Sequence, residues 1–439
     1  MFYQKYEVQL LFITLSQLLV LSCYDADRAN PLDGTAFSLF IPNISKPIGG
    51  EEMFPGIPQE IRWRPAARVL DSSVAIHLIC EGDTTVIIES TSNDGVYEWD
   101  VPDSPSRSCR IRIVGMGGSS QSPGAFRIRK RPVEAQIDIG GIEAVLDDGP
   151  HRPTALREKI IFTATQGGNT DIWLLDRSET PSFPSRLTSN PYYDGEAAWL
   201  KPNGTVITYT SEDSTGQQDV WIRATEGMFG PQTTRVTQNG GTEPAWRNML
   251  ESDSYSNPAL IYKLTDNQGL SRLITADLDF NMASLPMFTL PIRFTNPQVS
   301  LPLHTGPVFL EAPIDNAYWF SDGSDNFVIY GGYDPTRLYE VSFFQEKYDF
   351  ATNTSFGVRP GLVPSHPSIS PDGQFVAFSS QDDIWLSPIG GVVAWRVTLG
   401  NTIDGYPDWA TNNEIVFQRK NTGGAKWQLW AVQRPDDVP

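Results

Sequence analysis

Six residues stand at one repeated place along the chain, and five of them carry side chains that can hold a polar ligand. Each directly precedes a proline, or in one copy an alanine, at the start of a short hydrophobic segment. The six are Arg152, Glu196, Glu243, Gly306, His366 and Tyr406. If they surround one opening, they would bind a small polar ligand or the tip of a partner segment. The alternative is that these groups only hydrate the opening.

The sequence contains none of the common catalytic motifs. It has no Gly-x-Ser-x-Gly elbow, no His-Glu-x-x-His segment and no paired Cys-x-x-Cys site. The acidic turn at 322–325 lacks the full spacing of a calcium loop. We interpret Asp171, Asp219 and Asp383 as strand-edge residues rather than catalytic acids. We therefore expect no metal and no cofactor, and we favour a protein that is not an enzyme.

The elements that must position the six residues form a repeat between about Val133 and Val432. Each unit has an inner strand, a Pro-Asp/Asn-Gly turn, a hydrophobic strand, an Asp-[Ile/Val]-Trp strand and an edge strand near Arg-[Leu/Val]-Thr. The copies that begin at Asp194 and His366 show it best. In the turn, proline presets φ, Asp or Asn caps its own backbone, and glycine takes a positive φ. Recurring four-stranded units of this kind predict a β-propeller.

Counting the Asp-[Ile/Val]-Trp strand or its equivalent predicts six blades. The markers are Trp173, Trp221, Leu273, Tyr339, Trp385 and Trp430. After Trp430 the chain has no room for a fourth strand, whereas the alternating segment 135–139 precedes the first blade. We expect this segment to complete the last blade as a velcro strand, which leaves no open sheet edge. Because inner strands line a propeller's channel, the six aligned residues should ring one mouth.

These blades resemble the WD-type repeats of TolB, the periplasmic propeller of the Tol–Pal envelope system, and of its relatives. The resemblance covers the repeat region and implies its fold. It does not extend to TolB as a whole, which begins with an α/β domain. We therefore carry over the TolB-like propeller and not TolB's partners.

A second resemblance concerns the histidines. Some pectin-fragment lyases are propellers with a histidine-bound metal at the channel, and His151, His304 and His366 fall near inner-strand entries. This resemblance implies an alternative function, that of a glycan-binding protein or a metal-dependent glycan lyase. The other interpretation is that these are scattered loop histidines.

Residues 34–131 carry a different strand pattern. Val74, Ile76 and Leu78 alternate with their neighbours, and a Gly turn, a Tyr-x-Trp-x-Val-Pro segment and an Arg-Ile-Arg-Ile strand follow. This order resembles the Ig-like module at the start of yeast cell-wall synthesis proteins and in many bacterial surface proteins. The resemblance implies a β-sandwich that serves as a spacer or adhesive module.

Cys80 and Cys109 both lie in this module. An even pair in an oxidising compartment suggests one disulfide. In a sandwich of the Ig-like order the two strands are antiparallel neighbours, so the two sulfurs can lie opposite each other. The alternative is a pair of buried free thiols.

The N-terminus predicts export. The apolar run from Val8 to Leu21 is too short to span a bilayer and is typical of a signal peptide. The sequence Val-Leu-Ser-Cys at 20–23 resembles the bacterial lipobox, which implies lipidation of Cys23; the alternative is a plain secretory signal. Since no second hydrophobic segment follows, the mature chain would be anchored rather than threaded. Tyr24 replaces the Asp that retains enterobacterial lipoproteins at the inner membrane, so the resemblance favours the outer membrane.

Composition and charge complete the sequence-based expectations. The chain has 36 Gly, 34 Pro, 12 Trp and 15 Tyr, which favours strands and turns. The net charge of −19 argues against nucleic-acid binding. We expect an all-β chain with a lipoprotein signal peptide (1–22), a tether (23–33), an Ig-like β-sandwich (34–131) and a six-bladed propeller with velcro closure (132–435). Its function would be that of a monomeric, non-catalytic envelope scaffold that binds envelope proteins or a small polar ligand.

Overall fold

The computed structural model shows a chain built from β-strands. The described residues are 43–65, 73–115, 118–201, 204–225, 233–249, 259–265, 271–279, 293–294, 299–300, 315–321, 325–331, 337–344, 350–357, 362–389, 393–424 and 426–436. Within these ranges there is no α-helix, only a 3-10 turn at Ile142–Ala144. No helix in this part of the chain is long and apolar enough to cross a membrane. The internal contacts divide the chain into two units, between Arg131 and Pro132.

The first unit consists of two sheets. The smaller sheet contains β1 (Asn43–Lys46), β3 (Pro58–Arg64) and β6 (Val96–Asp100). The larger sheet has the order β2 (Glu52–Met53), β9 (Phe126–Ile128), β7 (Ser106–Gly115), β4 (Ser73–Cys80) and β5 (Asp83–Ser92), and β8 (Gly118–Gln121) also pairs with β7. Alternate residues of both sheets point inward, because successive side chains of a strand face opposite ways.

Both sheets of the first unit contribute to one apolar core. Trp63 of β3 and Trp99 of β6 pack in the same buried cluster as Ile76 of β4 and Ile111 of β7. Cys80 and Cys109 lie directly opposite each other on β4 and β7 and form a disulfide. The disulfide therefore links two strands of one sheet at the edge of this core.

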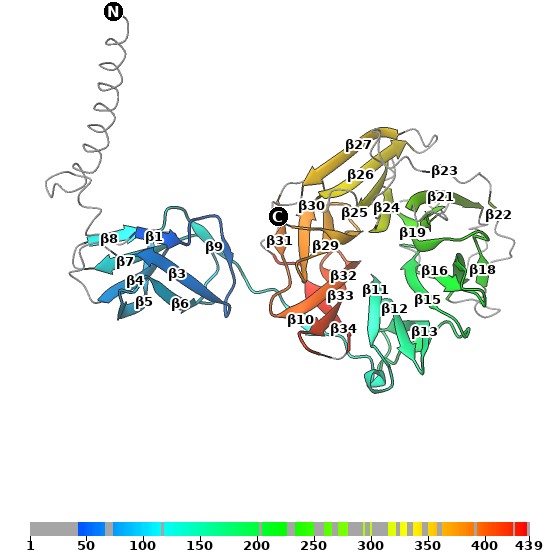
Figure 1. Cartoon of the computed structure of the whole chain (residues 1–439), viewed down its shortest axis with the longest axis horizontal. Coiled ribbons are helices and arrows are strands. Elements are labelled where there is room, and N and C mark those ends of the chain that lie inside the picture. Colours follow the sequence, from blue (N-terminus) through cyan, green and yellow to red (C-terminus); the bar gives the residue numbers. More distant parts are fainter. Residues whose placement is uncertain are drawn as a thin grey trace, which may run out of the picture. The chain divides into compact units, whose positions relative to one another are not determined.

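The second unit has a propeller-type arrangement of sheets around a central axis (Figure 1). Its first sheet contains β11 (Pro150–Leu156), β12 (Lys159–Gln166), β13 (Asn169–Asp176) and β14 (Ser185–Arg186). The next contains β15 (Asp194–Trp199), β16 (Val206–Glu212), β17 (Gln218–Ala224) and β18 (Thr233–Arg235). A third four-stranded sheet contains β28 (Ser365–Ile369), β29 (Phe375–Ser380), β30 (Asp383–Pro388) and β31 (Trp395–Arg396).

A nine-stranded sheet lies between the second and third of these. It arises because β19 (Thr242–Met249) and β24 (Asp315–Ser321) pair in parallel and so join two antiparallel sets. The set of β19 includes β20 (Ala259–Thr265), β21 (Ser271–Asp279), β22 (Arg293–Phe294) and β23 (Val299–Ser300). The set of β24 includes β25 (Asp325–Gly331), β26 (Arg337–Phe344) and β27 (Phe350–Gly357).

The last sheet combines strands from both ends of the second unit. It has the order β10 (Glu134–Gln136), β34 (Gln428–Gln433), β33 (Glu414–Asn421) and β32 (Thr402–Thr411). Glu134 fastens β10 in place, because its carboxylate accepts hydrogen bonds from the Leu399 backbone N–H and the Arg419 guanidinium. The short strand at the start of the unit thus completes the sheet that ends it.

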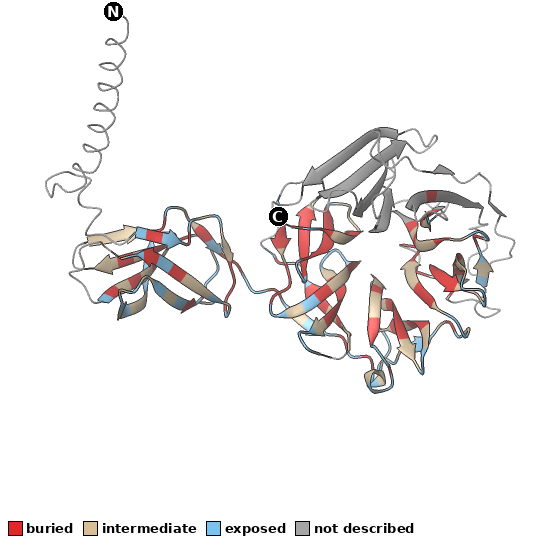
Figure 2. Ribbon diagram, in the orientation of Figure 1, coloured by how far each residue is buried: buried red, intermediate tan, exposed pale blue. Residues whose placement is uncertain are grey.

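The second strand of each four-stranded sheet is buried on both faces. β12, β16, β29 and β33 each carry a run of at least five consecutive buried residues, and Figure 2 shows these as red segments between neighbouring sheets. Such continuous burial requires apolar residues at successive positions rather than in alternation. The first strands lie nearest the axis, and they position the site described below.

A buried aspartate clasp explains two of the repeated sequence motifs. The Asp219 carboxylate accepts hydrogen bonds from the Arg235 guanidinium and from the Thr237 hydroxyl, at 2.8 Å for the latter. The same hydroxyl accepts the Val220 backbone N–H at 2.9 Å. Equivalent clasps join Asp171, Arg186 and Thr188, and Asp383, Arg396 and Thr398. The sequence suggested that these three aspartates are strand-edge residues. In the structure they are buried, and each one binds the outer strand of its sheet.

Candidate functional site

The first strands of five sheets share one unusual backbone feature. Arg152, Glu196, Glu243, His366 and Tyr406 all have positive φ, between 45° and 55°. Each lies in a bulge, since the pairing register with the second strand shifts around it. A left-handed residue turns the strand locally and aims its side chain away from the regular alternation. The five residues that the sequence alignment selected therefore stand at one conformational position.

The register identifies an equivalent bulge position in β24. Gly306 lies outside the described residues. β24 carries the same register shift between Asp315 and Tyr318, which aligns Asn316 with Glu196 of β15. The sequence alignment placed Gly306 here because Pro307 follows it, whereas Ala317 follows Asn316. The sequence signal that could have found it is the tryptophan three residues after the bulge, present at Trp199, Trp246, Trp319 and Trp409.

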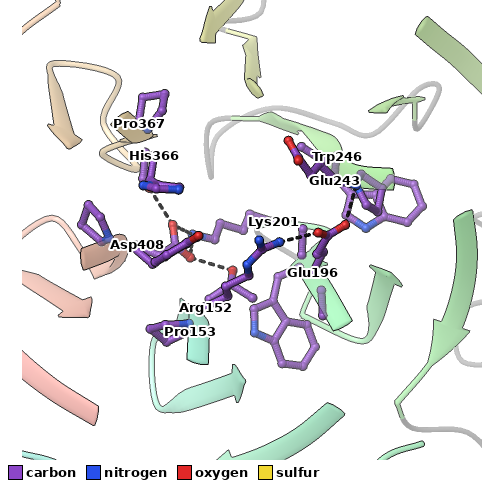
Figure 3. A pocket seen from close by; sticks show the side chains of 18 residues that line it. Arg152, Pro153, Glu196, Lys201, Glu243, Trp246, His366, Pro367 and Asp408 are labelled. Carbon is purple, nitrogen blue, oxygen red and sulfur yellow. Dashed lines mark hydrogen bonds and ion pairs between the residues drawn. The ribbon is translucent and has the colours of Figure 1, made fainter. Parts of the chain in front are cut away.

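The five bulge residues open onto one cavity of about 120 Å³ on the propeller axis. Its described walls come from β11, β15, β19, β28 and β32, and from Lys201, two residues after the end of β15. Figure 3 shows these side chains converging from different sheets. The lining residues are Arg152, Pro153, Thr154, Glu196, Ala197, Ala198, Trp199, Lys201, Glu243, Pro244, Ala245, Trp246, His366, Pro367, Ser368, Tyr406, Pro407 and Asp408. We call Arg152, Glu196, Glu243, His366 and Tyr406 the mouth residues.

Two ion pairs organise the mouth. Arg152 points toward Glu196 and donates from Nη1 to Oε1 of its carboxylate (Figure 3). The other oxygen of Glu196 accepts from the Thr210 hydroxyl and the Glu243 backbone N–H, both at 2.8 Å. Lys263 lies 2.7 Å from the Glu243 carboxylate. Burial lowers the pKa of Arg152, but Glu196 and two nearby tyrosines outweigh it and raise the pKa, so Arg152 stays charged.

Aromatic rings complete the other side of the mouth. The His366 and Tyr406 rings lie 3.7 Å apart between centroids, and the Arg152 guanidinium lies 5.3 Å from the centre of the Tyr406 ring. Neighbouring sheets also bind the bulge backbone directly. The Arg152 N–H donates to Gln418, and the Tyr406 N–H donates to the Ser379 hydroxyl. Side chains of one sheet therefore fix the bulge of the next.

Tyr193 is outside the set of cavity-lining residues but lies near the charges of Arg152 and Glu196, and the sequence analysis missed it. Its ring folds across Gly195, where any Cβ would collide with the phenol oxygen. Burial, followed by the nearby charge of Glu196, raises the pKa of Tyr193, and the charges of Arg152 and Glu243 also act on it. The phenol therefore lies beside the mouth and keeps its proton. Gly195, two residues after Tyr193, was the available signal, because a residue without a Cβ allows this close approach.

A buried carboxylate forms the inner end of the cavity. Asp408 accepts hydrogen bonds from Lys201 at 2.8 Å, from the Thr154 hydroxyl at 2.7 Å and from the Ser368 hydroxyl at 2.6 Å. The Ala155 backbone N–H also donates to it. Figure 3 shows Lys201 reaching toward Asp408. These partners come from β11, β28 and the end of β15, so one carboxylate connects four sheets.

The other predicted residues lie elsewhere. Cys23 and His304 fall outside the described residues. His151 does not line the cavity but bonds Asp148 at 2.9 Å. Burial lowers the pKa of His151, which favours its neutral form. Among the described residues, no group of three or more His, Cys, Asp or Glu side chains is placed to hold a metal ion.

No protein-family model matches the chain. Tricorn protease homolog 1 of Streptomyces coelicolor is 33% identical over 70 residues, which are 16% of this chain and 7% of that protein. The chain thus spans only a small part of this curated relative.

Solved structures resemble the chain distantly. A protein of unknown function from Bacteroides thetaiotaomicron is 12% identical with a TM-score of 0.39, and the match covers 89% of this chain and 98% of that one. A quinoprotein alcohol dehydrogenase-like protein from the same species is 9% identical with a TM-score of 0.31, over 89% and 97% of the two chains. A post-proline cleaving enzyme from Rickettsia typhi is 10% identical with a TM-score of 0.34, over 78% and 52%.

The left-handed mouth positions predict a reversed preference for glycine over alanine. His366→Gly should be more stable than His366→Ala by about 1 kcal/mol, since only a residue with a Cβ is strained at this φ. Ser365, the preceding residue of β28, is the control, and there the glycine variant should be the less stable one. Urea unfolding of the four variants measures the difference. An alanine variant at 366 as stable as the glycine variant would contradict the bulge geometry.

The Lys201–Asp408 pair predicts a large asymmetry between single and double substitution. Asp408→Asn leaves the buried Lys201 ammonium without its counter-charge and should cost about 3–5 kcal/mol. Combining it with Lys201→Met removes that charge and should recover at least half of the loss. Denaturant unfolding of wild type, both single variants and the double variant measures this coupling. A single variant that unfolds like wild type would show that the pair does not hold the sheets together.

Proposed function

We propose that this chain is a lipid-anchored, non-catalytic binding scaffold of the bacterial cell envelope. Its second unit would be a six-bladed, TolB-like β-propeller whose mouth binds a protein partner or a small polar ligand. Its first unit would be an Ig-like spacer. The scaffold would act as a monomer and carry its anchor on Cys23, at the outer membrane.

The arrangement of the sheets supports six blades. Six first strands, β11, β15, β19, β24, β28 and β32, each begin an antiparallel set, and the parallel pairing of β19 with β24 merges two of these sets into one sheet. The pairing of β10 with β34 supports velcro closure. For the first unit, two sheets around one core and the disulfide between β4 and β7 support a sandwich of Ig-like type.

One observation carries the binding role of the mouth. Five positions need a left-handed backbone, for which glycine is the least strained residue, yet all five hold large polar or aromatic side chains. Strain of about 1 kcal/mol or more at each of several positions is retained where the side chain has a use. Hydration of a channel would not need an arginine, two glutamates, a histidine and a tyrosine at these positions. The mouth therefore has the character of a binding site.

The inner end of the cavity supports binding rather than passage. Lys201 and Asp408 form an ion pair in the cavity wall, and their side chains are only 10% and 7% exposed. A ligand that enters past the mouth residues would meet this pair within the described walls. The mouth is thus suited to hold the end of a molecule.

Substitution of Cys23 tests the anchor. Wild-type protein should label with a fatty-acid analogue and sediment with membranes, because acylation adds about 0.8 kcal/mol of membrane affinity per buried CH₂. Cys23→Ser should lose the label and appear in the soluble envelope fraction. Cys80→Ser with Cys109→Ser is the matched control and should keep the label. Labelling that persists in Cys23→Ser would contradict the anchor.

Photo-crosslinking in cells tests the mouth. A crosslinking amino acid in place of Glu243 should capture a discrete partner or ligand, whereas the same residue in place of Glu89 of β5 should not. Reversing the charge of Glu196 (Glu196→Lys) in the Glu243 crosslinking background should abolish capture, since the mouth would carry two cations side by side. Unchanged capture after this reversal, in a folded variant, would remove the mouth from the function.

A further inference from the structure

The charged side chains of the cavity differ in how many hydrogen bonds they make within the protein. Glu196 already accepts from three donors, which are Arg152, Thr210 and the Glu243 backbone. Asp408 accepts from four donors at the inner end. Arg152 differs, because among the described residues its side chain makes one hydrogen bond, to Glu196, and it is 32% exposed. A guanidinium has five N–H groups, so Arg152 retains donors for a ligand.

Two phenols lie beside this guanidinium. The Tyr406 ring packs 5.3 Å from Arg152 between the ring centre and Cζ, and Tyr193 folds over Gly195 next to Glu196. Within the described part of the chain, neither hydroxyl has a hydrogen-bond partner. Burial raises the pKa of Tyr193, so its hydroxyl remains a donor. The mouth thus presents a group of donors, while the Glu196 carboxylate already accepts from three internal donors.

We propose that the mouth binds its ligand through a carboxylate, which Arg152 holds with help from the hydroxyls of Tyr193 and Tyr406. This proposal rests on the proposed function of the mouth as a binding site. An ionised carboxylate only accepts hydrogen bonds, and its two oxygens match the fork of a guanidinium. Glu196 and the Tyr406 ring hold the guanidinium from other directions and fix its plane before the ligand arrives.

The charge balance favours a single negative charge on the bound group. The cations Arg152, Lys201 and Lys263 pair one to one with Glu196, Asp408 and Glu243. A monoanion adds one charge beside the most exposed cation. A phosphate would bring nearly two charges close to Glu196 and Glu243 with no further cation among the described lining residues. The carboxylate could belong to a free organic acid or to the end of a peptide, and the experiment distinguishes these sources.

The test measures binding of acids and their neutral counterparts to the purified full-length protein by calorimetry. The probes are acetate and acetamide, D-glucuronate and D-glucose, and trialanine as free acid and as C-terminal amide, with inorganic phosphate as a further anion. At least one acid should bind at least about tenfold more tightly than its neutral counterpart and than phosphate. Acetate or glucuronate binding would identify a free acid, whereas selective trialanine binding would identify a chain end.

Variants assign the binding to the proposed residues. Arg152→Lys keeps the positive charge but loses the two parallel N–H donors of the guanidinium, and it should lower the affinity for the acid about tenfold or more. Tyr193→Phe and Tyr406→Phe remove only a hydroxyl and should each weaken it about threefold to tenfold. Arg177→Gln, which removes another arginine–glutamate pair away from the cavity, and Tyr262→Phe should bind like wild type. Unfolding curves of all variants confirm that each is folded.

The outcomes separate this proposal from the proposed function. Equal binding of an acid and its neutral counterpart, or full binding by folded Arg152→Lys and Tyr variants, would overturn the carboxylate site. If none of the acids binds while crosslinking from position 243 still requires Glu196, the carboxylate proposal is wrong and the binding scaffold stands. If crosslinking is also lost, both proposals fall.

Discussion

The second unit depends most on the burial of one carboxylate, that of Asp408. A buried carboxylate is tolerated only when donors surround it, and the donors here come from three other sheets. Thr154, Ser368 and Asp408 each stand two residues after a mouth residue, so the network that satisfies Asp408 also places Arg152, His366 and Tyr406. The hydrogen bonds to Asp408 therefore depend on the backbone positions of the mouth residues, so the buried polar network and the mouth are coupled.

The bulge explains how a repeat with a buried first strand can present functional side chains. Regular alternation would send every second side chain toward the axis, where the space is small. A left-handed residue interrupts this alternation and leaves its N–H free of the ladder, and neighbouring sheets supply acceptors such as Gln418 and Ser379. Hydrogen bonds to a neighbouring sheet thus compensate the N–H that the bulge removes from the ladder. The side chain at the bulge position can therefore differ from sheet to sheet.

The local sequence motifs were sufficient to predict most of the mouth residues. The contacts between residues far apart in the sequence could not be predicted from them. The alignment of the repeats selected five residues that line the cavity, and a proline follows four of them, because proline and the left-handed residue belong to one local conformation. Asn316 was passed over because Gly306, earlier in the same repeat, is followed by a proline and was aligned in its place. Lys201 and Asp408 could not be paired from sequence, since 207 positions separate them and each is unremarkable in its own strand. Tyr193 was missed because it precedes β15, and its ring can approach the mouth only because Gly195 has no Cβ.

The pairing of β10 with β34 has a mechanical consequence. Glu134, the first residue of β10, is paired with Val432 near the end of β34, and the two strands are antiparallel. The chain therefore enters β10 and leaves β34 at the same end of this strand pair. Tension applied through the segments that flank this pair would open its hydrogen bonds one after another, as in a zipper, rather than shear them together. The hydrogen bond from the Gln433 N–H to the Val133 carbonyl would bear the load first, and the links of Glu134 to Leu399 and Arg419 would resist next.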